Sequence, residues 1–193
     1  MAEDRFARFV SLACHDLRTP LATVSGFAHT LRQNELGQPA ARYVEMIQAA
    51  SGQLAEILDD LGLAARIESG RFAPNLQEAD TLELASAAAG RVGEKAAAGG
   101  TGAEVRVERD ATERGLAALA RCALRHGGLE QVELSAEGTV VAVVPVLESV
   151  GPIILGDDLK DLGAAAARQL VESTGGSVEL AGERLLVRLA STS

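Results

Sequence analysis

The sequence is poor in cysteine and aromatic residues, and it has no long apolar run. Its 193 residues include two cysteines, four Phe, one Tyr and no Trp. Cys14 and Cys122 are far apart, and neither belongs to a CxxC pair or to a Cys/His spacing typical of zinc, so no metal site is expected. Scattered cysteines without a secretory leader favour a reducing cytoplasm. No stretch approaches the roughly 20 apolar residues of a membrane-spanning helix, so no membrane segment is expected.

Basic residues are also scarce. The chain has 18 Lys and Arg against 27 Asp and Glu, a formal net charge of -9, and it contains no basic block. This balance argues against a nucleic-acid-binding surface, which requires clustered Lys and Arg. Hydrophobic residues make up 47% of the chain, enough for a sizeable core built mainly from Ala, Leu and Val.

Two long amphipathic helices are predicted before residue 69. In the first, apolar residues recur at steps of three or four, which places them on one helix face. These residues are Phe6, Val10, Ala13, Leu17, Leu21, Val24, Ala28 and Leu31. Asn34, Gly37 and Pro39 then signal a stop. The second helix carries a heptad seam. The seam consists of Tyr43, Ile47, Ala50, Leu54, Ile57, Leu61 and Ala64. The short connection predicts an antiparallel hairpin.

The hairpin by itself cannot enclose a core. Each helix of roughly 30 residues is about 45 Å long, and two such hairpins pair naturally into a four-helix bundle. We therefore expect a homodimer. The alternative is that the hairpin packs against the C-terminal domain of its own chain.

A mixed α/β region follows the hairpin. The segment Ser69–Asn75 contains Gly70 and Pro74 and is a plausible linker, which divides the chain into domains 1–69 and 75–193. Period-two apolar runs predict strands at 103–108, 132–134, 139–144 and 185–189. Ala-rich segments predict helices at 81–97, 112–126 and 159–173. Interleaved strands and helices indicate an α/β sandwich with helices on one face of a mixed sheet.

The segment around His15 carries the clearest chemical signal. His15 lies two residues before Leu17, so it points about 160° away from the apolar stripe, onto the open helix face. Thr19 shares that face, Asp16 is adjacent, and Pro20 removes a backbone donor and should bend or loosen the helix. A neutral imidazole is a nucleophile that a neighbouring carboxylate can orient, and a hydroxyl one turn later could position a water. Alternatively, His15 is an ordinary solvated residue.

The full string favours the functional interpretation. His-Asp-Leu-Arg-Thr-Pro-Leu, beginning at His15, resembles the phosphoacceptor box of sensor histidine kinases in two-component signalling. The resemblance implies that His15 is phosphorylated, that Asp16 is its acid/base neighbour, and that Thr19 takes part in dephosphorylating a response regulator. Pro20 would mark the helix bend, and Arg18 matches the box without a firm catalytic role.

The second region resembles the ATP-binding domain of the same family in outline. Cys122, within Arg121–Gly128, stands where that family has an asparagine that helps to hold Mg²⁺. The strand Val140–Val144 is not followed by the family's Asp-x-Gly-x-Gly loop. Of the phosphate-binding glycines only Gly163 remains, and Asp161 places a negative charge where a phosphate would approach. The segment between these motifs is also short for an ATP lid. The resemblance therefore implies a degenerate ATP-binding domain.

These features together predict a histidine phosphotransferase that passes a phosphoryl group between His15 and response-regulator aspartates. No cofactor is expected, because the partner receiver domain would supply its own Mg²⁺. Regulator phosphatase activity through Thr19 could coexist with this function. The alternatives are a divergent sensor kinase that uses ATP and a non-catalytic pseudokinase scaffold that binds a regulator. His29 and His126 are interpreted as surface or cap residues.

Overall fold

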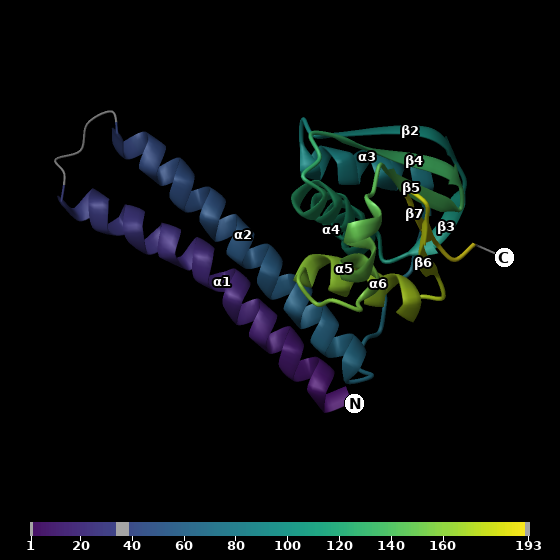
Figure 1. Cartoon of the computed structure of the whole chain (residues 1–193), viewed down its shortest axis with the longest axis horizontal. Coiled ribbons are helices and arrows are strands. Elements are labelled where there is room, and N and C mark those ends of the chain that lie inside the picture. The colour runs from purple at the N-terminus through teal and green to yellow at the C-terminus, as the bar shows by residue number, and fades with distance from the viewer. Residues whose placement is uncertain (1, 34–38, 192–193) are drawn as a thin grey trace. The chain divides into compact units, whose positions relative to one another are not determined.

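The computed structural model describes residues 2–33 and 39–191, and the side chains of residues 2–8, 11, 14, 25, 28, 29, 32, 33, 39 and 41 are not described (Figure 1). The sequence-based statements on Phe6, Cys14, Ala28, His29 and the Asn34–Gly37 stop signal lie outside the described residues. The chain forms two compact units, Met1–Gly62 and Leu63–Ser193. No helix within the described part of the chain is long and apolar enough to cross a membrane.

The first unit is the predicted helical hairpin. Helix α1 (Ala2–Gln33) and helix α2 (Pro39–Glu68) run antiparallel in Figure 1. Near the end of α1 and the start of α2, the rings of Phe27 and Tyr43 stack with centroids 5.6 Å apart and an interplanar angle of 26°. Such offset stacking holds the two helices together at this end of the hairpin.

The predicted heptad seam of α2 is confirmed. Each of its seven residues is buried or half-buried, as the 4-3 spacing requires.

The last turns of α2 belong to the second unit, where Leu63 forms a buried cluster with Ala111 and Leu170. The Gln169 amide donates a hydrogen bond to Glu68 Oε1 at 2.5 Å, which fixes the end of α2 against helix α6.

The predicted stripe of α1 is only partly correct. Ala13 is buried and Leu17, Val24 and Leu31 are half-buried, but Val10 is 39% exposed and Leu21 is 56% exposed. Phe9 and Pro20 are buried instead. Phe9, Ala13, Pro20 and Phe27 fall within an arc of about 40° at 100° per residue. The apolar residues of α1 therefore extend around more of the helix than the face that is covered within a single chain.

The second unit is an α/β sandwich. Its strands are β1 (Gln77–Asp80), β2 (Ala96–Gly102), β3 (Glu104–Val107), β4 (Val132–Gly138), β5 (Val140–Val144), β6 (Ser177–Ala181) and β7 (Arg184–Arg188). Its helices are α3 (Thr81–Val92), α4 (Arg109–Gly127), the 3₁₀ turn η1 (Glu148–Val150), α5 (Gly151–Leu155) and α6 (Leu162–Ser173). The main sheet has the order β2-β4-β5-β7-β6, parallel between β2 and β4 and otherwise antiparallel, and β1 and β3 form a separate antiparallel pair.

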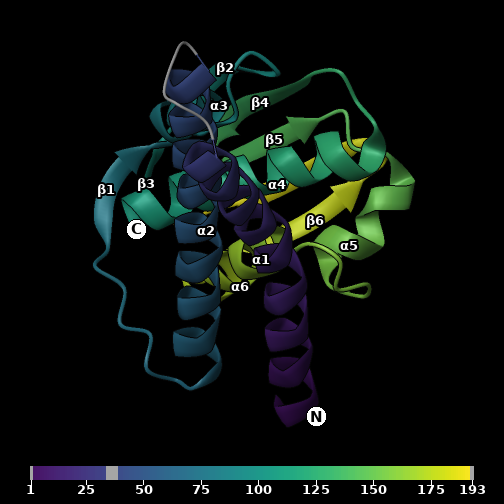
Figure 2. The same cartoon turned by 90° about the vertical axis from the view of Figure 1, so that its left-hand side faces the viewer.

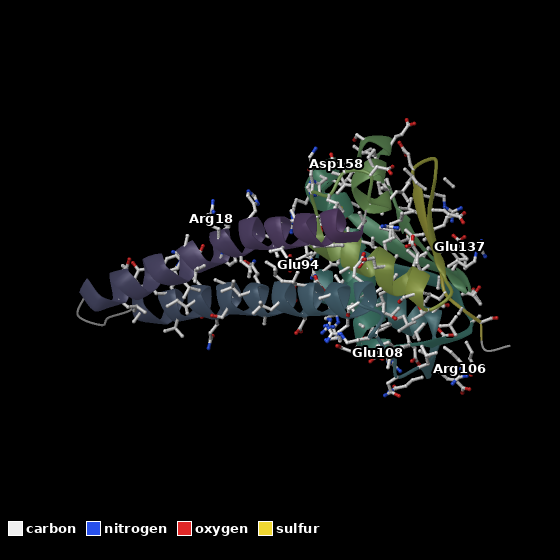
Figure 3. The ribbon with its side chains drawn as sticks, turned by 90° about the horizontal axis from the view of Figure 1, so that it is seen from below. Arg18, Glu94, Arg106, Glu108, Glu137 and Asp158 are labelled. Atoms are coloured by element: carbon white, nitrogen blue, oxygen red, sulfur yellow. The ribbon has the colours of Figure 1, made fainter. Side chains whose placement is uncertain are left out.

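Helices α3, α4 and α6 cover one face of the main sheet, as predicted (Figures 1 and 2). Residues aligned across the strands make the inner layer, with Leu134 opposite Val143 and Val141 opposite Val187. All four of these side chains are fully buried. The alternate positions include Glu137, labelled in Figure 3, whose side chain forms an ion pair with that of Arg184. Period-two alternation thus gives the sheet one buried and one solvated face.

The predicted helix 81–97 is too long, because its last residues belong to the edge strand β2. Helix α3 ends at Val92, and Gly93 follows with φ 89°, a conformation that glycine adopts without strain. The chain then forms β2, whose Ala- and Gly-rich sequence has no period-two signal. Gly100 explains part of this composition, because a Cβ at this position would lie 2.2 Å from the carbonyl oxygen of Ala136 in the neighbouring strand. Strands β1 and β6 and the short helix α5 were also not predicted.

Candidate functional site

The imidazole of His15 projects from the exposed face of α1. Its side chain is 78% exposed, and its Nδ1 atom lies 3.1 Å from Oδ1 of Asp16, whose side chain is 25% exposed. Consecutive residues on a helix are about 100° apart. Asp16 therefore lies at the boundary of the covered face, and its carboxylate reaches sideways to the ring.

This contact defines the chemistry available to the ring. When the carboxylate accepts a hydrogen bond from Nδ1–H, the neutral tautomer keeps its lone pair on Nε2. The nitrogen that is not engaged by Asp16 is then the nucleophile. The carboxylate also stabilises the positive charge that develops on the ring when Nε2 forms a new bond.

Two other residues of the segment share the exposed face. Thr19 lies about 40° and Arg18 about 60° around the helix from His15, on opposite sides of it. Both side chains are exposed, and Arg18 projects from α1 away from α2 in Figure 3. A partner protein that reaches His15 therefore also meets a hydroxyl and a guanidinium.

Pro20 occupies the covered side of the same helix turn, where it is buried. It lacks an N–H group, so the backbone carbonyl of Asp16 does not receive the usual helix hydrogen bond four residues on. Nevertheless, α1 continues through this position to Gln33. One turn later, the Thr23 hydroxyl donates to the Thr19 carbonyl at 3.0 Å. Pro20 thus loosens one turn next to His15 without ending the helix.

A second polar cluster lies in the α/β unit, where the end of α4 meets the start of α6. Asp161 is the N-cap of α6, and its Oδ1 accepts a hydrogen bond from Ala164 N–H at 3.1 Å. Its Oδ2 lies 3.3 Å from Arg125 Nη1 and 3.3 Å from His126 Nε2. Cys122, one turn before His126 on α4, completes the cluster. The interpretation of His126 as a surface or cap residue misses this arrangement, because the ring is only 22% exposed and faces Asp161.

Cys122 is fully buried in this cluster. Burial raises the pKa of its thiol far above the ordinary range, and the nearby Asp161 carboxylate raises it further. A thiol with such a raised pKa stays protonated at neutral pH and is a poor nucleophile. Cys122 is therefore no candidate for covalent catalysis in the cluster as it stands.

The segment that joins β5 to α6 packs into the core. Val146, Val150 and Ile154 are fully buried, and they belong to the same hydrophobic cluster as Cys122. A Cβ at Gly127 would contact Leu129 and lie 3.6 Å from a methyl group of Val150, so apolar side chains adjoin the C-terminal end of α4. Gly163, the remaining glycine of the predicted phosphate loop, lies in the first turn of α6.

The structure thus separates the predicted residues into two groups. His15, Asp16, Arg18, Thr19 and Pro20 share two turns of α1, and Cys122, Asp161 and Gly163 lie at the α4–α6 junction. The convergence of His126 with Cys122 and Asp161 was not predicted. A signal existed, because a Cys and a His four residues apart share one helix face, but the third member is distant in sequence.

Comparison with known proteins places the first group in a defined family. Residues 7–70 match the family model of the His Kinase A (phospho-acceptor) domain. The histidine protein kinase DivJ of Caulobacter vibrioides is 29% identical over 189 residues, covering 88% of this chain and 31% of DivJ. The sensor protein DivL of the same organism is 31% identical over 103 residues, covering 53% of this chain and 13% of DivL. The chain therefore spans about a third or less of these relatives.

Solved structures share the fold of both units. The histidine kinase AdeS of Acinetobacter baumannii superimposes with a TM-score of 0.66 at 16% identity, covering 93% of this chain and 98% of AdeS. A bacterial phosphotransferase superimposes with a TM-score of 0.52 at 17% identity, covering 97% of this chain and 96% of that one. Residues 7–70 thus belong to the His Kinase A (phospho-acceptor) domain family, and the α/β sandwich that follows has the fold seen in histidine kinases.

Proposed function

We propose that this protein is a histidine phosphotransferase of a phosphorelay. In this proposal His15 accepts a phosphoryl group from the aspartate of one response-regulator receiver domain and passes it to another, without the use of ATP. The observation that carries the proposal is the exposed His15 ring, whose Nδ1 lies 3.1 Å from Asp16 Oδ1. In the proposed reaction, Nε2 is the nucleophile.

The transfer step follows from this geometry. Nε2 attacks the phosphorus atom of an aspartyl phosphate, an N–P bond forms, and the P–O bond to the aspartate breaks. The aspartate carboxylate leaves with the electron pair of that bond. The imidazole becomes cationic, and the Asp16 carboxylate next to Nδ1–H stabilises this charge. The reverse sequence delivers the phosphoryl group to a second aspartate, so no other phosphoryl donor is required.

The α4–α6 junction supports the part of the proposal that excludes ATP. Mg²⁺ in nucleotide sites requires hard oxygen ligands, and Cys122 offers a buried, protonated thiol instead. A helix N-terminus binds phosphate through free backbone N–H groups. At the start of α6, the Asp161 carboxylate already accepts the Ala164 N–H and adds a negative charge. The residues present therefore do not fit Mg²⁺-ATP, and no step of the proposed reaction passes through it.

The proposal includes a homodimer that forms through the hairpin. Within the described residues, Val10 and Leu21 on α1 and Val44 and Leu58 on α2 are large apolar side chains between 39% and 56% exposed. Val44 and Leu58 are two heptads apart, so they share one face of α2 beside its buried seam. A second hairpin packed on these positions would complete a four-helix bundle. Residues 1–69 would then form the dimerisation and phosphotransfer domain, and residues 75–193 would help to dock the regulator.

The exposed Thr19 supports a second activity at the same face. Its hydroxyl lies one helix turn from His15, where it could position a water against the acyl phosphate of a docked receiver domain. Hydrolysis there would remove the phosphoryl group from the regulator instead of storing it on His15. Phosphotransfer and phosphatase activity would then share one docking surface.

A two-receiver relay assay tests the proposal. One receiver domain from the source organism is labelled with ³²P by a small acyl phosphate, purified, and mixed with the full chain and a second, unlabelled receiver domain. We expect label to pass to the chain and then to the second receiver only when His15 is present. A His15→Gln variant should transfer nothing, and a Glu45→Gln variant at an exposed position of α2 is the control that should keep transfer. Transfer that persists in His15→Gln, or no transfer across the organism's full set of receivers, would overturn the proposal.

A further inference from the structure

The α4–α6 junction contains three metal-ligating side chains in one cluster. Cys122 and His126 lie four residues apart on α4, on the same side of the helix, and Asp161 immediately precedes α6. One ligand atom from each residue lies within 4.8 Å of the other two. The His126 Nε2 and Asp161 Oδ2 atoms are 3.3 Å apart.

The cluster lies mostly inside the protein. Cys122 is fully buried and the Asp161 side chain is 8% exposed, whereas the His126 ring, at 22% exposure, lies toward the solvent. The cluster is thus a buried site with one accessible side. Arg125 also contacts Asp161, but its side chain is 63% exposed. Its guanidinium can therefore swing into solvent and leave Asp161 Oδ2 to a metal ion.

The His126 ring provides a second, independent observation. Its Nε2 atom is buried and makes no hydrogen bond of acceptable geometry, although Asp161 Oδ2 is 3.3 Å away. A buried imidazole nitrogen without a hydrogen bond normally destabilises a fold. A cation between the nitrogen, the carboxylate oxygen and the sulfur would satisfy all three atoms at once.

The ligand chemistry selects the class of metal. Sulfur and imidazole nitrogen are the donors preferred by zinc, whereas Mg²⁺ takes oxygen ligands almost exclusively. Zinc–ligand bonds of about 2.0–2.3 Å place tetrahedral ligand atoms roughly 3.3–3.8 Å apart. The His126–Asp161 separation of 3.3 Å falls in that range, and the Cys122 sulfur lies within 4.8 Å of both ligand atoms.

We propose that Cys122, His126 and Asp161 bind one Zn²⁺ ion, with a fourth coordination position open toward the solvent side of His126. The ion would tie the last turn of α4 to the first turn of α6. On binding, the Cys122 thiol releases its proton to solvent and a Zn–S bond forms, with no change in oxidation state. The site stands independently of the phosphotransfer proposal.

Cobalt substitution in the full-length chain tests this site directly. The protein is purified, stripped with a chelator, reduced, and titrated with Co²⁺ and then with Zn²⁺. We expect saturation at one equivalent, a thiolate-to-cobalt charge-transfer band in the near ultraviolet, and intense visible bands that indicate tetrahedral coordination. Zn²⁺ should displace Co²⁺ and raise the Tm of the protein.

Conservative variants assign the ligands. Cys122→Ser should abolish the charge-transfer band, and His126→Gln should weaken binding by more than the roughly 10- to 100-fold that loss of an outer ligand partner causes. Asp161→Asn should do the same while it keeps the N-cap of α6, since Asn is as good a cap as Asp. Cys14→Ser is the matched control and should leave the titration unchanged.

Two results would overturn the inference. One is the absence of a one-equivalent Co²⁺ or Zn²⁺ complex in the folded, reduced wild-type chain. The other is a charge-transfer band that survives in Cys122→Ser or disappears in Cys14→Ser. Circular dichroism of each variant shows whether the fold is retained. If Cys122→Ser does not fold, the test rests on Asp161→Asn, which should weaken metal binding, and on Cys14→Ser, which should not.

Discussion

The Nδ1 atom of His15 lies 3.1 Å from the Oδ1 atom of Asp16, its immediate neighbour on α1. This contact leaves Nε2 as the nitrogen that Asp16 does not engage, on an imidazole that is 78% exposed. It also gives the developing imidazolium a carboxylate partner without burying either group. The proposed phosphotransfer chemistry depends on this one relationship.

Replacing Asp16 with Asn should slow phosphoryl transfer to His15. The amide cannot stabilise the imidazolium as a carboxylate does, so we expect a loss of roughly 100-fold in rate, at the lower end of general acid–base contributions. Rapid-quench measurement of the single-turnover rate from a labelled receiver domain checks this. An unchanged rate would show that Asp16 has only a structural role.

Replacing Thr19 with Ala should separate the two proposed activities. The variant loses the hydroxyl that could position water, but it keeps the His15–Asp16 pair. We therefore expect loss of receiver dephosphorylation with phosphotransfer retained within about threefold, a difference of less than 1 kcal/mol. Release of inorganic phosphate and label on the chain are measured in parallel. Retained phosphatase activity, or equal loss of both activities, contradicts the role given to Thr19.

The exposed apolar side chains of the hairpin predict that a charged substitution among them would prevent dimerisation. Leu58 is 56% exposed on α2, and Leu58→Glu would place a charge in the centre of the proposed bundle. A buried unpaired charge is strongly unfavourable, so we expect sedimentation analysis to show a monomer. Gln53→Glu, at an exposed position about 140° around the same helix from Leu58, is the control and should leave the dimer intact. A wild-type chain that sediments as a monomer would remove the dimer from the account.

Asp161 should stabilise the α/β unit through its cap and its ion pairs. Its side chain accepts the Ala164 N–H and lies 3.3 Å from both Arg125 and His126. In metal-free buffer, Asp161→Ala should lower the free energy of unfolding by about 1–3 kcal/mol, and Asp161→Asn by less, because the amide still caps α6. Urea unfolding followed by circular dichroism measures both values. Equal stabilities of the two variants would show that the cap contributes nothing.

Much of the hairpin was predictable, because its signals are periodic. The heptad seam of α2 from Tyr43 to Ala64 has one covered face in the structure, as its spacing requires. Helix α1 was less predictable. Its apolar residues cover more than one face, so periodicity could not decide between Val10, which is exposed, and Phe9, which is buried. That choice depends on which side a neighbouring helix covers.

In the second unit, the four predicted strands correspond to β3, β4, β5 and β7, whereas β1, β2 and β6 were missed. Strand β5 has an apolar sequence that predicts a strand, and its residues Val141 and Val143 lie on the buried inner face of the sheet. Strand β2 has neither signal, and its place is set by parallel pairing with β4 and by the close approach at Gly100. The Cys122–His126–Asp161 cluster is likewise a product of tertiary packing, since α6 brings Asp161 to α4 from far along the sequence.

The most direct test of the central claim compares two phosphoryl donors on the same preparation of the full-length chain. One sample receives Mg²⁺ and γ-³²P-labelled ATP, and the other receives a ³²P-labelled receiver domain with Mg²⁺ and no nucleotide. A His15→Gln variant accompanies each sample, and acid lability of the label identifies a phosphohistidine. The account predicts label from the receiver domain and none from ATP, with no label on the variant. Phosphorylation of His15 from ATP would contradict it and would identify the protein as a divergent kinase.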